Sequence, residues 1–586
     1  MIKILKYFNL KEWFMSAISL LFIVAQVWLS LKIPDFMAEV TRLTQTPGSP
    51  IKAIWINGGY MMLCALLSIV SAIIVGYFAA KISASFSQRL RSLLFNKVDS
   101  FSMEELNRFS TSSLITRSTN DITQIQMFIV IALQIAIRAP IMAIWALTKI
   151  VGKGANFVYI VAIALLLVIS VITILMIKVI PKFRKMQVLT DNITRVTREN
   201  LTGLRVVKAY NAEEYQEKKF EKANEELTNT QMFTNRAMSI MNPLMTVVMN
   251  GLSLAIYWVG AYMIDAASMF DKLTIFSNMV VFSSYAVQVI ISFMMLIMIF
   301  IMLPRASVAA NRVNEVLDTK ANIIDGTKDK GKQESIGEIR FKNVSFSYPG
   351  ACSPVLENIS FSAKKGETIA FIGSTGSGKS TLVNLIPRFY DTTEGEVLID
   401  GINVKEYKLK KLLNKIGYVP QQATLFKGSV KSNVAYGDNG LNSYTKEAIN
   451  NAIKIAQAND FVQNMDGDID APISQSGANI SGGQKQRISI ARAICRNPEI
   501  YIFDDSFSAL DYKTDRILRT ALKKETSNVT SIIVAQRIGT IIDADKIIVL
   551  DEGKIVGQGN HKDLLKNCKI YKEIAISQLS EEELTS

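Results

Sequence analysis

A glycine-rich loop in the second half of the chain has the residue types and spacing of a phosphate-binding loop. It follows an apolar strand expected at 367–372 and precedes an apolar helix start at 382–386. Glycines let backbone N–H groups approach phosphate oxygens, while Lys379 can neutralise the β- and γ-phosphates and Ser380 can ligate Mg²⁺. We therefore predict that ATP is bound by Gly373, Ser374, Thr375, Gly376, Ser377, Gly378, Lys379, Ser380 and Thr381.

A second chemical signal is an apolar segment at 500–503 that ends in two carboxylates. Asp504 and Asp505 follow it directly. A buried strand ending in acidic residues beside a phosphate-binding loop is typical of a Mg²⁺–nucleotide site, in which the first carboxylate holds the metal shell. We predict that Asp504 and Ser380 are ligands of Mg²⁺. The alternative is a strand that ends in a solvated turn.

A third motif lies between these two: Ser481, Gly482, Gly483 and Gln484. With this motif the chain resembles ABC transporters, specifically the exporter-type half-transporter in which six membrane spans are fused to one ATPase domain. The resemblance covers nearly the whole chain. It implies that this signature loop faces the γ-phosphate of ATP held by a partner subunit, so that two ATP molecules lie between two ATPase domains.

The same resemblance assigns three further positions. Tyr348 resembles the aromatic residue that stacks on adenine. Gln421 resembles the catalytic glutamine that contacts Mg²⁺ and the membrane half, although Gln422 is adjacent. Asp511 resembles the D-loop aspartate. The alternatives are a plain strand tyrosine, a polar loop residue and a helix cap, respectively. His561, the only histidine, is interpreted as structural.

Two positions depart from the family pattern. Asp505 stands where the family usually has Glu, and Gln536 stands where it usually has His. Aspartate is one methylene shorter, which withdraws the carboxylate from the attacking water by on the order of 1 Å, and misplacement of that size can cost about 10²-fold in rate. Glutamine can donate a hydrogen bond to a γ-phosphate but cannot become a cation. Tolerated variation is the alternative.

These departures resemble the degenerate-site subunit of a bacterial heterodimeric multidrug exporter. The resemblance implies that the site with Lys379, Asp504, Asp505 and Gln536 binds ATP but hydrolyses it slowly. The partner is expected to carry Glu and His at the two positions and an altered signature loop. A homodimer is the less favoured alternative.

The first half of the chain is predicted to span a membrane. Apolar segments of about 20 residues suffice for a spanning helix, and they occur at 13–33, 54–80, 122–147, 157–180, 240–264 and 273–303. Residues 1–320 carry 31 Lys and Arg against 19 Asp and Glu, whereas residues 321–586 carry 34 against 32. Because the basic excess is confined to the apolar half, it indicates cytoplasmic loops and not a nucleic-acid surface.

The basic residues gather in the terminal segments and in the long loops 81–121 and 181–239. The positive-inside rule therefore places both termini, both long loops and the ATPase domain in the cytoplasm. Arg138 is the one charge deep inside a predicted span. Such a charge either lines a cavity or packs structurally.

The predicted fold is multidomain. An all-α six-helix transmembrane domain occupies 1–317, a polar linker 318–335, and an α/β P-loop ATPase domain with a helical signature-loop subdomain 336–586. By resemblance, contacts around 113–117 and 210–213 couple the two domains. The expected function is an ATP-driven exporter in the cell membrane, moving amphipathic drugs, lipids or peptides by alternating access. The alternatives are a nucleotide-sensing regulatory subunit and an importer of the same architecture.

Overall fold

The structure is a computed structural model that describes residues 2–46, 48–151, 155–439, 444–525 and 528–579. Its contacts divide the chain into two units. The first comprises Met1–Lys97 and Ser112–Thr319, and the second comprises Val98–Thr111 and Lys320–Ser586. The first long loop thus contributes a short piece, 98–111, to the unit that contains the phosphate-binding loop.

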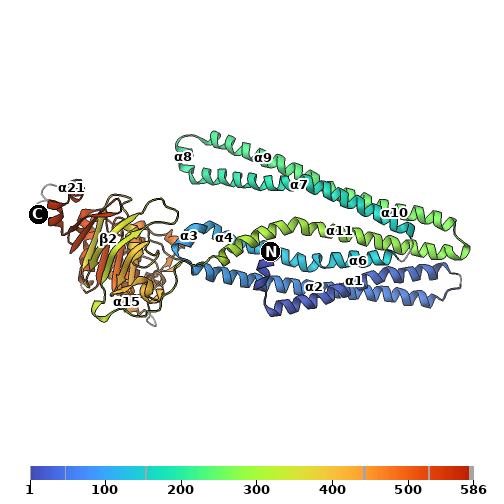
Figure 1. The fold of residues 1–586 in the computed structure, drawn as a ribbon, viewed down its shortest axis with the longest axis horizontal. Helices are drawn as coiled ribbons and strands as arrows, with labels where there is room; N and C mark the ends of the chain where they lie inside the picture. Colours follow the sequence, from blue (N-terminus) through green and yellow to red (C-terminus); the bar gives the residue numbers. More distant parts are fainter. Residues whose placement is uncertain (1, 47, 152–154, 440–443, 526–527, 580–586) are drawn as a thin grey trace. The chain divides into compact units, whose positions relative to one another are not determined.

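The first unit is entirely helical among the described residues (Figure 1). Six of its helical segments are long and apolar enough to cross a bilayer, which agrees with the six predicted spans. Two of these segments, Thr111–Ile150 and Glu213–Asp265, are each built from several helices. The helices are a short 3-10 helix Ile2–Tyr7, α1 Leu10–Gln45, α2 Ile51–Asp99, α4 Thr111–Thr116, α5 Ile122–Ile131, α6 Arg138–Val151, α7 Ala155–Thr202, α8 Leu204–Ala209, α9 Glu213–Ser239, α10 Met241–Asp265 and α11 Met269–Asp318.

Helix α7 continues well beyond the predicted apolar stretch 157–180, whereas α10 matches its stretch and α9 precedes it in the same helical segment. Figure 1 shows α7 and α9 side by side, joined at their far end by the short helix α8. Tyr210, in the second predicted coupling contact, follows α8 directly and is 79% exposed. Its coupling role stays a prediction.

Helix α11 is the central helix of the first unit, contacting α1, α6 and α10. The hydroxyl of Tyr285 on α11 donates to a carboxylate oxygen of Asp35 on α1 at 2.7 Å, and Lys149 on α6 binds the other oxygen of that carboxylate at 2.9 Å. One carboxylate thereby ties three helices together. Buried polar groups are tolerated where each one finds such a partner.

Arg138 opens α6 directly after a π-helical segment, Ala132–Ala136. Its Nε is buried and has no hydrogen-bond partner among the described residues. Single π-helical turns are frequent at functional sites. The cavity-lining and the structural interpretation of Arg138 both stay open.

The second unit contains a six-stranded, mostly parallel sheet in the order β12-β11-β3-β10-β9-β6 and a four-stranded antiparallel sheet in the order β2-β1-β4-β5. The inner parallel strands β3, β10 and β9 are mainly apolar and largely buried, as expected for strands covered on both faces. The strands are β1 Ile339–Phe346, β2 Leu356–Ala363, β3 Thr368–Gly373, β4 Glu394–Ile399, β5 Ile402–Asn403, β6 Ile416–Val419, β7 Gly428–Ser429, β8 Pro472–Ile473, β9 Ile500–Asp504, β10 Thr530–Val534, β11 Lys546–Asp551 and β12 Lys554–Gly559.

Helices cover these sheets and form a separate helical layer before β9. They are α3 Met103–Phe109, α12 Lys379–Leu385, α13 Leu409–Asn414, α14 Val430–Val434, α15 Lys446–Ile455, α16 Asn459–Gln463, α17 Gly482–Cys495, α18 Tyr512–Glu525, α19 Ile538–Ile541, α20 His561–Asn567 and α21 Lys569–Ile576. Helices α14, α15 and α17 share one apolar core. The predicted α/β domain with a helical signature-loop subdomain is confirmed.

Helix α3 comes from the first long loop and packs with the ATPase residues. Asn107 donates to the hydroxyl of Tyr390 at 3.0 Å, and the Glu105 carboxylate accepts from the backbone N–H of Asn322 at 2.9 Å. The prediction placed the first coupling contact further on, at 113–117. Arg117 instead bonds Glu315 within the first unit at 2.8 Å, so the predicted contact at 113–117 stays a prediction.

Candidate functional site

Strand order brings the predicted site residues together. Strands β3, β10, β9 and β6 are consecutive and parallel, with Val534 paired to both Phe371 and Asp504. The carboxyl ends of parallel strands meet at one edge of the sheet, where ligands bind. The glycine-rich loop follows β3, Gln536 follows β10, the two aspartates close β9, and Gln421 follows β6.

Lys379 lies inside the loop that it belongs to. Its ammonium donates to the carbonyl oxygens of Gly373 at 2.9 Å and Ser374 at 2.6 Å, and to the hydroxyl of Ser377 at 3.3 Å. Burial lowers the pKa of Lys379, and the nearby Asp505 and Asp504 carboxylates oppose this by raising it. Gly378 has φ +95°, and a Cβ there would lie 2.8 Å from the Leu356 side chain, so only glycine fits this turn.

Ser380 and Asp504 form the predicted metal pair. The Ser380 hydroxyl donates to an Asp504 carboxylate oxygen at 2.9 Å, although the two residues are 124 positions apart. Burial raises the pKa of Asp504, and the Asp505 carboxylate adds to the rise. A hydroxyl and a carboxylate are oxygen ligands of the kind that Mg²⁺ prefers, and a divalent cation would relieve the buried negative charge. These residues therefore fit a Mg²⁺ ion.

The Asp505 carboxylate is hydrogen-bonded by two other candidate site residues, Gln536 and Gln421. Its carboxylate oxygen accepts from the Gln536 side-chain amide at 2.8 Å and from Gln421 at 3.4 Å. Burial raises the pKa of Asp505, while the hydrogen bonds from Gln421 and Gln536 lower it. Its φ of +46° lies in the left-handed region, which Asp tolerates better than most residues. The backbone is thus turned sharply at the predicted catalytic position.

Tyr348 is half-buried beside the first turn of α12. Its hydroxyl lies 3.0 Å from the hydroxyl of Thr381, and its ring meets Phe346 and Tyr390 edge-on at 4.9 and 5.3 Å between centroids. The ring is therefore fixed next to the phosphate-binding loop. This position suits a base-stacking residue, and the adenine contact stays a prediction.

The signature loop opens helix α17. Ser481 caps the helix by accepting from the Gln484 backbone N–H at 3.3 Å, and the Gln484 side chain accepts from the Ser481 N–H at 2.9 Å. Among the described residues, no hydrogen bond connects this loop to the glycine-rich loop of the same chain. Gly482 is exposed, and a Cβ there would meet nothing within 4 Å. The capping box thus fixes the start of α17, and Gly482 leaves open space beside it.

Asp511 caps the start of α18 by accepting from the Thr514 backbone N–H at 2.9 Å. This hydrogen bond lowers the pKa of Asp511. Within this chain Asp511 therefore acts as a helix cap, and its D-loop role stays a prediction. His561 is buried against Tyr571, with its Nδ1 at 2.7 Å from the hydroxyl, which fits the structural interpretation.

Sequence reasoning missed Gln578, which follows the last helix. Its side-chain amide donates to the Gln536 carbonyl at 2.8 Å, and its side-chain oxygen accepts from the Ile538 N–H at 2.8 Å. One side chain thereby holds the backbone on both sides of Arg537. Because Gln578 lies 42 residues beyond Gln536 in no motif, only the fold reveals this clamp.

Comparison with known proteins agrees with the fold and the motifs. Residues 356–508 match the ABC transporter family, and residues 16–293 match the ABC transporter transmembrane region. The chain is 38% identical to an uncharacterised ABC transporter ATP-binding protein of Mycobacterium tuberculosis, over 94% of this chain and 93% of that protein. It is 34% identical to the uncharacterised YfiB of Bacillus subtilis, over 97% of each.

Two further likenesses concern named transporters. The chain is 32% identical to the ATP-dependent lipid A-core flippase of Pseudomonas fluorescens, over 84% of this chain and 81% of the flippase. It shares the fold of a bacterial Atm1-family ABC exporter solved with ATP bound, at a TM-score of 0.78 and 23% identity, over 98% of this chain and 99% of that one. The chain belongs to the ABC transporter family, as a transmembrane region fused to an ATPase region.

Proposed function

We propose that this chain is one subunit of a heterodimeric ABC exporter whose own ATP site is the slow one. The observation that carries the proposal is the state of the Asp505 carboxylate. It is one methylene shorter than the family's glutamate and accepts a hydrogen bond from Gln536 at 2.8 Å. A carboxylate that lies further from the attacking water and already accepts another hydrogen bond is poorly placed to polarise that water.

The roles of the other residues follow from their positions. Lys379 and the loop N–H groups bind the β- and γ-phosphates of ATP, and Tyr348 stacks on the adenine. Ser380, Asp504 and Gln421 would hold Mg²⁺, which would neutralise phosphate charge when bound. Gln536 donates to the γ-phosphate in place of the usual histidine. Ser481 to Gln484 complete the partner's ATP site, where most hydrolysis takes place.

Binding of ATP drives transport because ATP favours the state in which the two ATPase domains are closed. A ligand shifts a conformational equilibrium only by its differential affinity for the two states. ATP contacted by two subunits has such a differential affinity. In this proposal the slow site keeps the domains together while the other site turns over, and the membrane helices alternate between inward- and outward-facing cavities.

The proposed substrate is amphipathic. The lipid A-core flippase among the relatives moves a lipid, and the membrane unit presents long apolar helices. Drugs, lipids and peptides of mixed polarity share the property of partitioning into a bilayer before transport. The partner is proposed to carry Glu and His at the two altered positions and a changed signature loop.

Co-purification tests the assembly. The chain is tagged, expressed in its native membrane with neighbouring genes intact, extracted in mild detergent and weighed by intact mass. A stoichiometric second half-transporter supports the proposal. A clean homodimer contradicts it, because both sites would then carry Asp505 and Gln536.

The same pair, Asp505 and Gln536, favours a second candidate, a regulatory subunit whose site senses nucleotide without productive turnover. Restoring both family residues, Asp505→Glu with Gln536→His, separates the candidates in a reconstituted transport assay. Loss of transport together with a rise in ATPase activity indicates regulation by the slow site. Retained transport with raised ATPase activity indicates a site that is merely slow.

A further inference from the structure

A basic cavity lies where the first membrane helix begins. Its volume is about 680 Å³, and it lies between the start of α1 and the extension of α2. It is lined by basic and apolar side chains together, including Lys11, Lys81, Arg89, Leu10 and Phe14.

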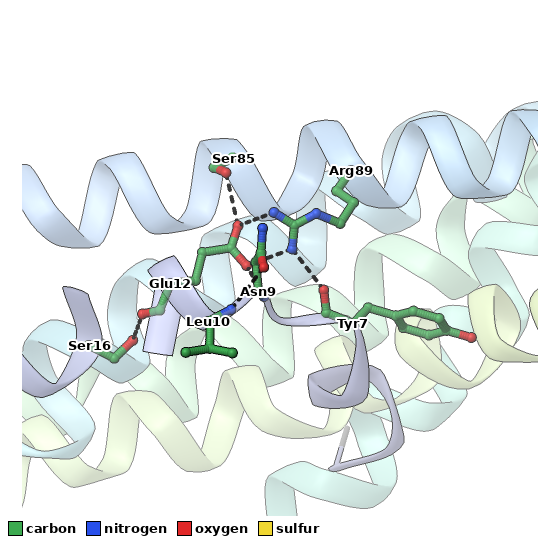
Figure 2. A network of polar contacts seen from close by, with 7 residues as sticks. All are labelled: Tyr7, Asn9, Leu10, Glu12, Ser16, Ser85 and Arg89. Carbon is green, nitrogen blue, oxygen red and sulfur yellow. Dashed lines mark hydrogen bonds and ion pairs between the residues drawn. The ribbon is translucent and has the colours of Figure 1, made fainter. Parts of the chain in front are cut away.

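The wall of the cavity is built around one buried carboxylate. Glu12 is 1% exposed, and its two oxygens accept from both terminal nitrogens of Arg89 at 2.9 and 3.0 Å and from the Ser85 hydroxyl at 2.9 Å (Figure 2). It also accepts from the Asn9 N–H at 2.8 Å, which closes a capping box at the start of α1. Arg89 further donates to the Tyr7 carbonyl at 2.9 Å.

This network neutralises one of the three basic side chains that line the cavity. Glu12 balances Arg89, so the pair adds no net charge. In the described part of the chain, Lys11 and Lys81 form no ion pair, and both are exposed. Lys81 is held over the Tyr77 ring at 5.5 Å, one helical turn before it on α2. The ammonium groups of Lys11 and Lys81 therefore keep their positive charge, and the Glu12–Arg89 contacts join the two helices that carry them.

The surroundings of these charges are apolar. Leu10 is 86% exposed and Phe14 is 67% exposed, and both lie within the apolar spanning segment that starts at Leu10. Trp13, between them, is 55% exposed, and tryptophan is enriched at the boundary between membrane and water. The cavity therefore lies at the level of lipid headgroups, with acyl chains beside Leu10 and Phe14.

The cavity lies on the cytoplasmic side. Lys6, in the short helix before α1, binds Asp318 at the end of α11 at 3.0 Å. The chain runs from Asp318 into the ATPase domain, which is cytoplasmic in ABC exporters. The start of α1 is therefore at the same end of the membrane unit. Basic pockets between helices on this side bind anionic lipid headgroups.

We propose that this cavity is a binding site for the phosphate headgroup of an anionic phospholipid of the cytoplasmic leaflet. Lys11 and Lys81 bind the phosphate, and the lipid's acyl chains lie along Leu10 and Phe14. The same chemistry could recognise a free phosphate ion. The apolar rim favours the lipid.

The test uses the complete transporter, delipidated in detergent and titrated with phosphatidylglycerol, with bound lipid followed by native mass spectrometry. Lys11→Ala with Lys81→Ala is expected to weaken the tightest phosphatidylglycerol binding by roughly tenfold or more, because each basic residue near the surface contributes to anionic-lipid affinity. Lys185→Ala with Lys222→Ala removes the same charge from the exposed surface of α7 and α9 and is the matched control. Lys11→Arg with Lys81→Arg is expected to restore binding.

A photoactivatable phosphatidylglycerol locates the site. Labelling of the start of α1 or of the segment 77–89 of α2 supports the proposal. Equal affinity of the alanine double variant and the parent, or equal affinity for phosphatidylcholine, overturns it. Protection of these segments by inorganic phosphate at concentrations comparable to the lipid also overturns the lipid assignment. Retained ATP photolabelling of Lys11→Ala with Lys81→Ala shows that the variant is folded.

Discussion

The side-chain amide of Gln536 donates a 2.8 Å hydrogen bond to the carboxylate of Asp505, the residue that directly follows strand β9. The two residues that depart from the family pattern thus contact each other directly. A histidine at 536 could carry a positive charge, and a glutamate at 505 would reach further. Because the two side chains are in contact, the effects of changing them are expected to be coupled.

Restoring both family residues should accelerate hydrolysis at this chain's own site. We expect Asp505→Glu with Gln536→His to raise that rate by up to about 10²-fold, because the carboxylate regains about 1 Å of reach. The measurement is steady-state ATPase activity of the complex in a Ser481→Arg background, where the other composite site is disabled. An unchanged rate would show that reach and charge do not limit this site.

The two ATP sites should respond unequally to single changes. Ser481→Arg obstructs the partner's site and is expected to lower ATPase activity by about 10²-fold, the scale of losing one preorganised donor. Lys379→Met removes ATP from this chain's own site and should leave most of the activity. Both are compared at saturating Mg²⁺–ATP, with photolabelling to report which site holds nucleotide. Equal losses for the two variants would contradict unequal sites.

Gln578 should control local opening of the segment after β10. Its side chain accepts from the Ile538 N–H at 2.8 Å and donates to the Gln536 carbonyl. Each such hydrogen bond contributes about 1 kcal/mol, so Gln578→Ala should speed amide exchange at Ile538 roughly fivefold. Hydrogen exchange with mass spectrometry measures this. Ser577→Ala, at the neighbouring exposed position, is the control and should leave exchange at Ile538 unaltered.

His561 should make the ATPase unit lose stability in mild acid. Burial lowers the pKa of His561 below its ordinary value of 6.5. Between the lowered pKa and 6.5 the unfolded chain binds more protons than the folded one, so stability falls as the pH falls through that window. We expect the thermal midpoint to drop more between about pH 8 and pH 5.5 in the parent than in His561→Gln. Parallel pH profiles would refute this.

Glu12 should be more costly to remove from α1 than the exposed Glu39. Glu12→Ala leaves Arg89 without its buried partner, which is expected to cost about 3 kcal/mol. Glu39→Ala breaks an exposed pair with Arg42 on the same helix and should cost less than about 1 kcal/mol. Thermal unfolding of the membrane unit compares the two. Similar midpoints for both variants would show that the Glu12 network does not stabilise the helix start.

Local sequence motifs were enough to assign the class of this protein. The glycine-rich loop, the acidic strand end and the signature loop are local patterns whose chemistry depends on residues adjacent in the chain. The six spans were also predictable from the sequence, because a spanning helix needs only a continuous apolar stretch. Its backbone hydrogen bonds are formed within the helix itself. The two altered positions, Asp505 and Gln536, were also visible without a structure.

How these motifs come together in space could not be predicted from the local patterns. Strand order placed Gln421, Asp505 and Gln536 at one edge, and no local pattern encodes which strands are neighbours. The Gln578 clamp and the pairing of Glu12 with Arg89 join residues far apart in the chain, through side chains that carry no motif. Such contacts arise from the packing of whole elements, so they exist only once the fold is formed.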